Sequence, residues 1–171
     1  EKEIGLKHLR QNTFVHAHGT GTPANRTTES HILNKIAQTF GIKKWPVSAI
    51  KSYLGHSMAP ASGDQLIASL GTWNNGVIPG IHSTDALAED VYSEHLDILL
   101  ENKTEEKDFY KGCFLNAKGF GGNNASAFIL SPEETRIRIQ SLVTKSKYDK
   151  YLKVVEQTRK NSIKYNELSL K

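Results

Sequence analysis

The sequence predicts an α/β domain, a mixed sheet covered by helices, followed by a helical C-terminal extension. Three observations carry this prediction. Short apolar strand patterns alternate with helix-periodic segments in the first part of the chain. A glycine-rich loop near residue 120 lies between two apolar strand patterns. After Leu130 the sequence becomes basic and helical, so we expect a domain over residues 1–131 and an extension over 132–171.

The first elements follow in order. Residues 14–18 form an apolar strand pattern after a polar segment, and a Gly/Thr/Pro/Asn loop is expected over 19–27. The next segment predicts a helix that stops at Gly41, because its apolar residues recur at helical spacing. These residues are Ile32, Leu33, Ile36, Ala37 and Phe40.

A second strand is expected over residues 46–50 and would end at Lys51. A small-residue turn then leads into a helix over about 62–75, with Gly76 as its C-terminal break. Residues 77–80 and 96–100 give weaker strand patterns. The chain so far alternates strand and helix, which is typical of a layered α/β domain.

Strands over 113–116 and 126–130 flank the glycine-rich loop, which predicts a tight hairpin. Ser131 and Pro132 then mark a helix start, as N-cap and first helical residue. Residues 133–171 contain 10 basic and 5 acidic side chains, whereas residues 1–132 contain 12 and 13. The net charge of +4 therefore belongs to the extension.

The composition limits the classes of protein. With 171 residues, 37% apolar and 23% charged, the chain fits an ordinary globular domain. No apolar run is long enough for a membrane span, no signal-peptide pattern is present, and no nucleic-acid module is recognised. Cys113 is the only cysteine, which excludes an internal disulfide and favours the cytoplasm. The absence of an initiating Met predicts that the true N-terminus lies elsewhere or has been removed.

Three small-residue turns carry the side chains capable of chemistry. They are residues 18–23 (HGTGTP), residues 51–56 (KSYLGH) and residues 119–124 (GFGGNN). His18 and His56 both lie beside glycines, where the backbone lets a substrate approach closely, although a histidine satisfied within a turn would look the same. Lys51 is either a surface residue or a partly buried charge, and Glu29 is a candidate partner.

Other chemistries fit less well. The loop at residues 119–122 lacks the ending of a phosphate-binding loop, so it is expected to line a cavity, with Phe120 as a gate, or to be an ordinary hairpin. His16, His18, His31, His56 and Cys113 could be ligands in principle. However, no carboxylate or CxxC motif accompanies them, and Lys51 would oppose a cation. No metal site and no cofactor are expected.

In this order and at these spacings, the three motifs resemble those of the β-ketoacyl-(acyl-carrier-protein) synthases over about residues 12–131. The resemblance implies a thiolase-like fold built from two related halves, of which this chain is the C-terminal one. It also implies that the nucleophilic Cys lies in the other half, because Cys113 precedes no helix and is expected to be a core residue. The amino-acid sequence of residues 25–30 (NRTTES) and the long extension most resemble those of stand-alone bacterial synthases.

The family reaction, implied by the resemblance, is the decarboxylative Claisen condensation of malonyl-acyl-carrier-protein with an acyl thioester in fatty acid biosynthesis. His18 and His56 correspond to the two donors that stabilise the enolate, and Lys51 and Glu29 to their supporting pair. Thr20 and Thr22 match positions that contact the pantetheine arm. Further matches in the glycine-rich loop are the gating aromatic and its neighbours, Phe120, Gly121 and Asn124.

The resemblance also implies an acyl carrier protein as partner, a homodimer of the complete enzyme, and a need for the N-terminal half. Three residues depart from the family pattern: His16, Arg26 and Lys118. They affect the expected acyl preference and the polarity of the pocket. A polyketide ketosynthase domain and a non-catalytic partner subunit of the chain-length-factor type remain alternatives, and a degradative thiolase is disfavoured by the KSYLGH motif.

Overall fold

The computed structural model describes residues 3–170. The chain divides into two compact units, with the boundary between Glu133 and Glu134. The boundary predicted from the sequence, between residues 131 and 132, lies two residues earlier. In the first unit, α1 (Gly5–Gln11) precedes β1 (Thr13–His16). α2 (Pro23–Phe40), β2 (Trp45–Ser48), the short α3 (Lys51–Leu54) and α4 (Ala61–Asn75) follow.

The remaining strands complete a five-stranded mixed sheet with the order β4-β2-β1-β6-β7. β4 (Leu96–Ile98), β2, β1 and β6 (Gly112–Lys118) are parallel, whereas β7 (Asn124–Leu130) runs antiparallel to β6. β3 (Val77–Ile78) and β5 (Lys103–Thr104) form a small separate sheet. β5 had no counterpart in the sequence prediction.

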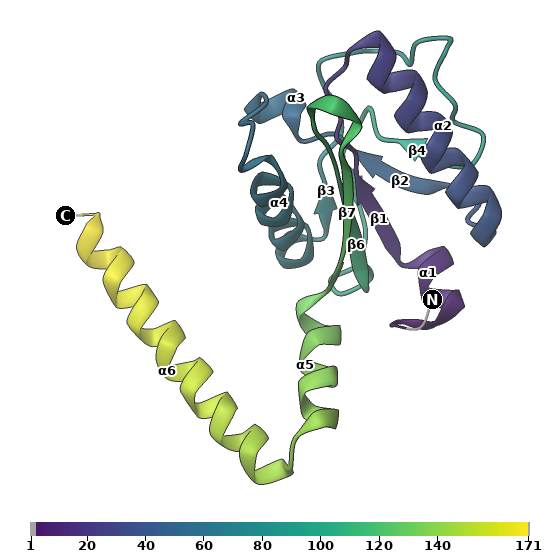
Figure 1. Cartoon of the computed structure of the whole chain (residues 1–171). Coiled ribbons are helices and arrows are strands. Elements are labelled where there is room, and N and C mark those ends of the chain that lie inside the picture. The colour runs from purple at the N-terminus through teal and green to yellow at the C-terminus, as the bar shows by residue number, and fades with distance from the viewer. Residues whose placement is uncertain (1–2, 171) are drawn as a thin grey trace. The chain divides into compact units, whose positions relative to one another are not determined.

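Helices cover both faces of the large sheet (Figure 1). One apolar cluster joins the sheet to α2, and its buried members are Val15, Ala17, Leu33, Ala37, Ile42, Trp45, Val47 and Leu96. A second cluster joins the opposite face to α4, and its buried members are Phe14, Trp73, Ile78, Leu99, Tyr110, Cys113 and Leu115. Successive residues of β1 therefore serve opposite faces, as the alternation of strand side chains requires.

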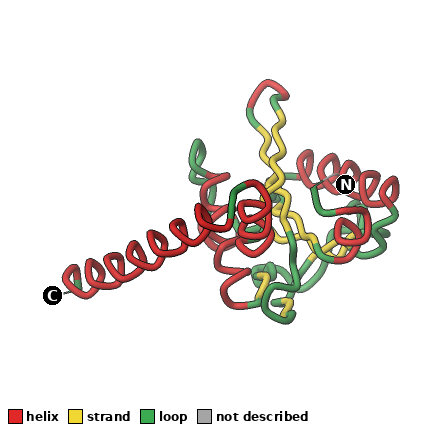
Figure 2. The backbone as a smooth tube through the Cα atoms, turned by 90° about the horizontal axis from the view of Figure 1, so that it is seen from below, coloured by secondary structure: helices red, strands yellow, loops and turns green. Residues whose placement is uncertain are grey.

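The β6–β7 hairpin extends beyond the other strands, and its tip carries the glycine-rich loop (Figure 2). The predicted tight hairpin is confirmed, with a short 3₁₀ turn at Phe120–Gly122. Cys113 is fully buried in β6, which confirms its expected place in the core.

Two sequence expectations about element ends were wrong. α2 begins at Pro23, so most of the expected loop over 19–27 is helical. Proline is favoured at the first helical position because its φ is already helical and its missing N–H has no partner to lose there. Lys51 does not end a strand but begins α3, because β2 stops at Ser48.

The second unit continues α5 (Pro132–Leu142) and contains α6 (Lys145–Ser169). α5 begins at the predicted Pro132. On α6 the rings of Tyr148 and Tyr151 lie side by side, with their centroids 6.0 Å apart. None of the helices in residues 3–170 combines the length and the apolar character that a membrane span requires.

Candidate active site

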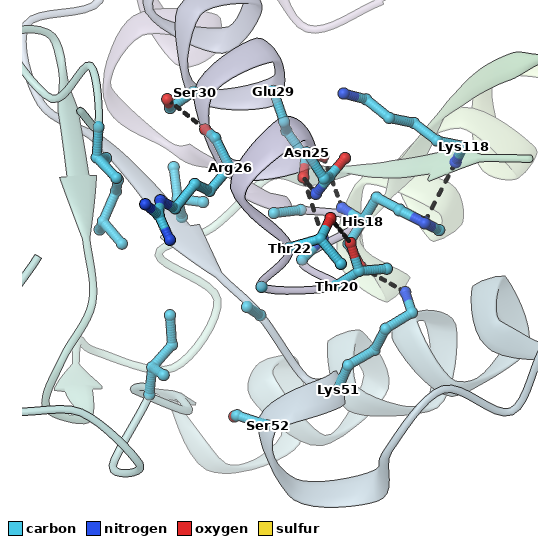
Figure 3. Close-up of a pocket in the computed structure, with 18 of the residues that line it drawn as sticks. His18, Thr20, Thr22, Asn25, Arg26, Glu29, Ser30, Lys51, Ser52 and Lys118 are labelled. Carbon is cyan, nitrogen blue, oxygen red and sulfur yellow. Dashed lines mark hydrogen bonds between the residues drawn. The ribbon is translucent and has the colours of Figure 1, made fainter. Parts of the chain in front are cut away.

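His18 follows the end of β1 and is buried, with 7% of its surface exposed. Its backbone N–H donates a hydrogen bond of 2.7 Å to Glu29 Oε1, and the N–H of Gly19 donates one of 3.0 Å to Oε2 (Figure 3). Gly19 has φ of +59°, and a Cβ there would lie 2.9 Å from the Cβ of Ala49. A larger residue at position 19 is therefore excluded. Glu29 holds the turn after His18 on one side, and Ala49 packs against it on the other.

Glu29 lies in the second turn of α2. Its carboxylate is buried and also accepts hydrogen bonds from the side-chain amides of Asn25, at 2.9 Å, and Asn116, at 2.5 Å. Four N–H donors thus compensate the desolvation of one carboxylate. Glu29 is a buried anchor that holds the peptide groups of His18 and Gly19.

Lys51 reaches the same peptide from the other side. Its Nζ donates a hydrogen bond of 2.5 Å to the backbone carbonyl oxygen of His18 (Figure 3). Burial lowers the pKa of Lys51, and the nearby charges of Glu29 and Asp64 oppose that shift. Within residues 3–170 no ion pair joins Lys51 to Glu29, the candidate partner, and the two charges influence each other only at longer range. The carboxylate is already occupied by its four N–H donors.

The two histidines come together although 38 positions separate them in the sequence. The ring centroids of His18 and His56 lie 5.3 Å apart in an edge-on arrangement. His18 Nδ1 accepts a hydrogen bond of 3.2 Å from the backbone N–H of Lys118. His56 Nδ1 accepts one of 3.0 Å from the backbone N–H of Met58. In a neutral imidazole the nitrogen that accepts cannot carry the hydrogen, so each ring presents Nε2–H as its donor.

The environment keeps His18 neutral. Burial lowers its pKa most, and the positive charge of Lys51 lowers it further, while Glu29 acts in the opposite direction. A neutral His18 with a backbone donor on Nδ1 has one defined tautomer at neutral pH. The pair is therefore an arrangement of two N–H donors, which suits binding of a developing oxyanion.

A cavity of about 1450 Å³ in the first unit brings several predicted residues together. His18, Lys51, His56 and Glu29 line it, and so do three further predicted residues, Thr20, Thr22 and Phe120. The hydroxyl oxygens of Thr20 and Thr22 lie 3.4 Å apart. Phe120 is 89% exposed at the hairpin tip.

The other two predicted residues lie elsewhere. Asn124 lines a smaller adjoining cavity of about 250 Å³, together with His18, Lys51 and His56, and its amide donates to the carbonyl of Gly122 at 3.0 Å. Gly121 lines neither cavity. It has φ of +74° within the 3₁₀ turn, where it allows the chain to reverse.

Two residues that bind Glu29, Asn25 and Asn116, were not predicted from the sequence. Asn25 could have been found, because it lies one helical turn before Glu29 once α2 is started at Pro23. Asn116 could not, since its contact with Glu29 spans 87 positions. Arg26, which departs from the family pattern, forms a two-point ion pair with Asp90 at 2.8 and 3.0 Å.

Cys113 cannot serve this site as a nucleophile. It is fully buried, its thiol donates to Ser69 Oγ at 3.2 Å, and burial raises its pKa to about 11. A thiol with that pKa is almost entirely protonated at neutral pH. Among residues 3–170, no cluster of three or more His, Cys, Asp or Glu side chains could hold a metal ion.

Residues 6–85 match the family model described as "Beta-ketoacyl synthase, C-terminal domain". The chain is 45% identical over 167 residues to β-ketoacyl-acyl-carrier-protein synthase FabY of Pseudomonas aeruginosa, an alignment that covers 98% of this chain and 26% of that protein. It is 25% identical to fatty acid synthase subunit alpha of Saccharomyces cerevisiae, over 86% of this chain and 8% of that one. The chain therefore spans about a quarter, or less, of these relatives.

Solved structures of ketosynthases superpose on this chain. The crystal structure of the noncanonical ketosynthase FabY from P. aeruginosa superposes with a TM-score of 0.92 at 45% identity, over 96% of this chain and 26% of that one. The ketosynthase from module 6 of the bacillaene synthase of Bacillus subtilis superposes with a TM-score of 0.64 at 26% identity, over 74% and 25% of the two chains.

Proposed function

Because this chain belongs to the β-ketoacyl synthase family as a C-terminal half, we propose that it provides the enolate-binding part of a condensing site. The reaction is the decarboxylative condensation of malonyl-acyl-carrier-protein with an acyl thioester in fatty acid biosynthesis. The observation that carries the proposal is the pair of neighbouring histidines, His18 and His56, each of which accepts a backbone hydrogen bond at Nδ1 and leaves Nε2 as the donor.

The chemistry explains why two donors are needed. When the malonyl thioester loses carbon dioxide, the electron pair of the broken C–C bond moves onto the thioester and gives an enolate. Two N–H groups aimed at the enolate oxygen lower its energy, and they act most strongly where water is excluded. The enolate carbon then attacks the acyl carbon on the nucleophilic Cys, a C–C bond forms, and the Cys thiolate leaves.

Lys51 and Glu29 support the donors without touching the substrate oxygen. They hold the carbonyl and the N–H of the His18 residue, so the peptide groups that flank it are fixed. The charge of Lys51 also helps to lower the pKa of His18. A neutral ring that accepts at Nδ1 carries its single hydrogen on Nε2, which is the donor that we assign to it.

The surrounding residues would receive the carrier-bound substrate. Thr20 and Thr22 offer hydroxyl groups to the amides of the pantetheine arm, in the same cavity as the histidines. Phe120 gates the cavity from the hairpin, while Gly121 and Asn124 shape the turn that bears it. The proposal includes no cofactor.

The proposal also includes partners. The nucleophilic Cys comes from an N-terminal half, the complete enzyme forms a homodimer, and an acyl carrier protein delivers the substrates. The basic extension would attract an acidic carrier protein, an attraction that salt weakens. The single buried thiol, Cys113, is compatible with the reducing cytoplasm that we propose as the location.

The direct test is reconstitution of the reaction. The chain would be produced together with an N-terminal half that carries the nucleophile, and supplied with acyl and malonyl carrier proteins. Mass spectrometry should detect the β-ketoacyl product, which should disappear when the nucleophilic Cys of that half is replaced by Ala. An assembly that binds carrier protein but forms no product and releases no carbon dioxide would instead support the non-catalytic partner.

A further inference from the structure

The loop that carries His56 has an unusual backbone. Gly55 has φ of +71° and Met58 has φ of +64°, one of only two non-glycine residues with positive φ among residues 3–170. A left-handed conformation is disfavoured for a residue with a Cβ, so the surrounding structure must hold Met58 in it. Such positions concentrate at functional sites.

This backbone has a direct effect on His56. The ring of His56 is exposed, and within the described chain its sole hydrogen bond comes from the N–H of Met58, at 3.0 Å to Nδ1. That bond selects the tautomer with hydrogen on Nε2. The backbone conformation of Ser57 and Met58 therefore determines both the orientation of the His56 ring and which of its nitrogens carries the hydrogen.

A side chain from α4 holds the backbone of Ser57 and Met58 in this conformation. The hydroxyl of Ser57, the residue between His56 and Met58, donates a hydrogen bond to Asp64 Oδ2. Asp64 lies in the first turn of α4, is half-buried, and its own N–H donates to the carbonyl of Pro60 at 3.1 Å. The N–H of Ala61 donates to the carbonyl of Met58 at 3.3 Å. The loop is therefore closed onto the helix at both Ser57 and Met58.

We propose that Asp64 is a positioning residue, which acts through Ser57 to hold the Met58 N–H on His56 Nδ1 and so presents His56 Nε2–H to the substrate. This inference rests on the proposed function, because the substrate oxygen defines the direction in which Nε2–H must point. Asp64 does not touch the substrate oxygen. A charged acceptor suits this task, because hydrogen bonds to a carboxylate are stronger than those between neutral groups.

The test uses the assembled enzyme with Ser57→Ala, Asp64→Ala and the double variant. We expect each single variant to lower kcat for malonyl decarboxylation by about 10- to 100-fold, since small misplacements of a catalytic group have effects of this size. KM should stay unchanged, and the double variant should be no slower than the slower single one. Ser57→Thr retains a hydroxyl and should restore the rate. Ser62→Ala, which removes a hydroxyl from the same helix turn, serves as the matched control.

A second readout separates positioning from a general structural role. In nitrogen-detected NMR, His56 should show one Nε2–H tautomer in the wild-type protein and a mixture of tautomers in Ser57→Ala and Asp64→Ala. An unchanged kcat in both variants, or a His56 tautomer unaffected by them, would overturn the proposal. An inactive wild-type assembly would count against the proposed function alone, because the NMR readout still tests the link from Asp64 to His56.

Discussion

His18 is oriented through its peptide group and Nδ1, which leaves Nε2 available to a ligand. Glu29 accepts from its N–H, Lys51 donates to its carbonyl, and the Lys118 N–H occupies Nδ1. The two charged side chains therefore stabilise the backbone of the site, while the reacting oxygen would meet neutral donors. Under the proposed function, the charged groups of Glu29 and Lys51 therefore bind the backbone of His18 and not the substrate oxygen.

The contacts of Glu29 give a prediction about stability. Glu29→Ala would leave four N–H donors without their acceptor, and a buried unsatisfied donor costs about 1–3 kcal/mol. We expect denaturant unfolding of the assembled enzyme to show a loss of at least roughly 3 kcal/mol. Glu156→Ala, which removes an exposed ion pair with Lys160 on α6, should change stability little. Equal effects of the two substitutions would contradict this account of Glu29.

His16 gives a prediction about pH. It is fully buried, neither ring nitrogen has a partner, and burial followed by the charge of Lys51 lowers its pKa to about 4. As pH falls below 6.5, His16 takes up a proton in the unfolded chain but stays neutral in the folded protein. Protonation therefore stabilises the unfolded state, and the free energy of unfolding decreases as pH falls from 6.5 toward 4. The loss should reach roughly 3 kcal/mol.

The measurement is the free energy of unfolding against pH for the wild type and for His16→Asn, which has no titrating ring. The variant should show a shallower decline between pH 6.5 and 4. Parallel curves for the two proteins would show that His16 does not titrate as its burial requires.

At the scale of elements, α2 links the site to the segment before β4. Arg26, Ser30 and Asn34 recur at every fourth position, and each bonds that segment: Arg26 to Asp90, Ser30 Oγ to the N–H of Tyr92 at 3.2 Å, and Asn34 Oδ1 to the N–H of His95 at 2.8 Å. Asp90 is exposed, whereas Ser30 and Asn34 are buried. The inner two contacts should therefore matter most for stability.

Asn34→Ala tests this ranking. It leaves the His95 N–H without its acceptor, so we expect a loss of about 1–3 kcal/mol in the free energy of unfolding. Arg26→Ala removes an exposed ion pair and should have a smaller effect, because solvent screens such pairs. A larger loss from Arg26→Ala than from Asn34→Ala would reverse the ranking.

The elements also show what the sequence could predict. Local signals located the hairpin at Gly119–Gly122, the Pro132 helix start and the Gly41 stop, because turns and caps depend on neighbouring residues. The start of α2 was missed, since Asn25 to Thr28 look like loop residues unless Pro23 is taken as the first helical position. The bond from Lys51 to the His18 carbonyl and the Ser57–Asp64 contact were not predicted, because both depend on where separate backbones come to lie.

At the scale of the whole molecule, the predicted thiolase-like ketosynthase fold is confirmed by the superposition on FabY. The motifs predicted it because their residues occupy the turns that follow β1, β2 and β6, where parallel strands end on one side of the sheet. The proposed function still requires a second half, since no cysteine at the site could carry the acyl group.

The exposed surface of α4 gives a prediction about assembly. Ile67 is 70% exposed and Leu70 is 49% exposed, on the helix that carries Asp64. Large apolar side chains exposed on one helix face mark a candidate site for packing against another chain or domain. We expect the chain alone to aggregate or bind a hydrophobic dye, and to become monodisperse when it is produced together with the N-terminal half. A monodisperse chain that unfolds cooperatively by itself, measured by ultracentrifugation and calorimetry, would contradict this prediction.

The most direct measurement is carbon dioxide release from malonyl carrier protein by the assembled enzyme, compared between wild type and His18→Ala. Loss of one oxyanion donor typically lowers the rate by about 100- to 1000-fold, and we predict a decrease of this size. The folded state of the variant would be checked by its unfolding transition. A His18→Ala enzyme that is folded and releases carbon dioxide at the wild-type rate would contradict the claim that this chain binds the enolate.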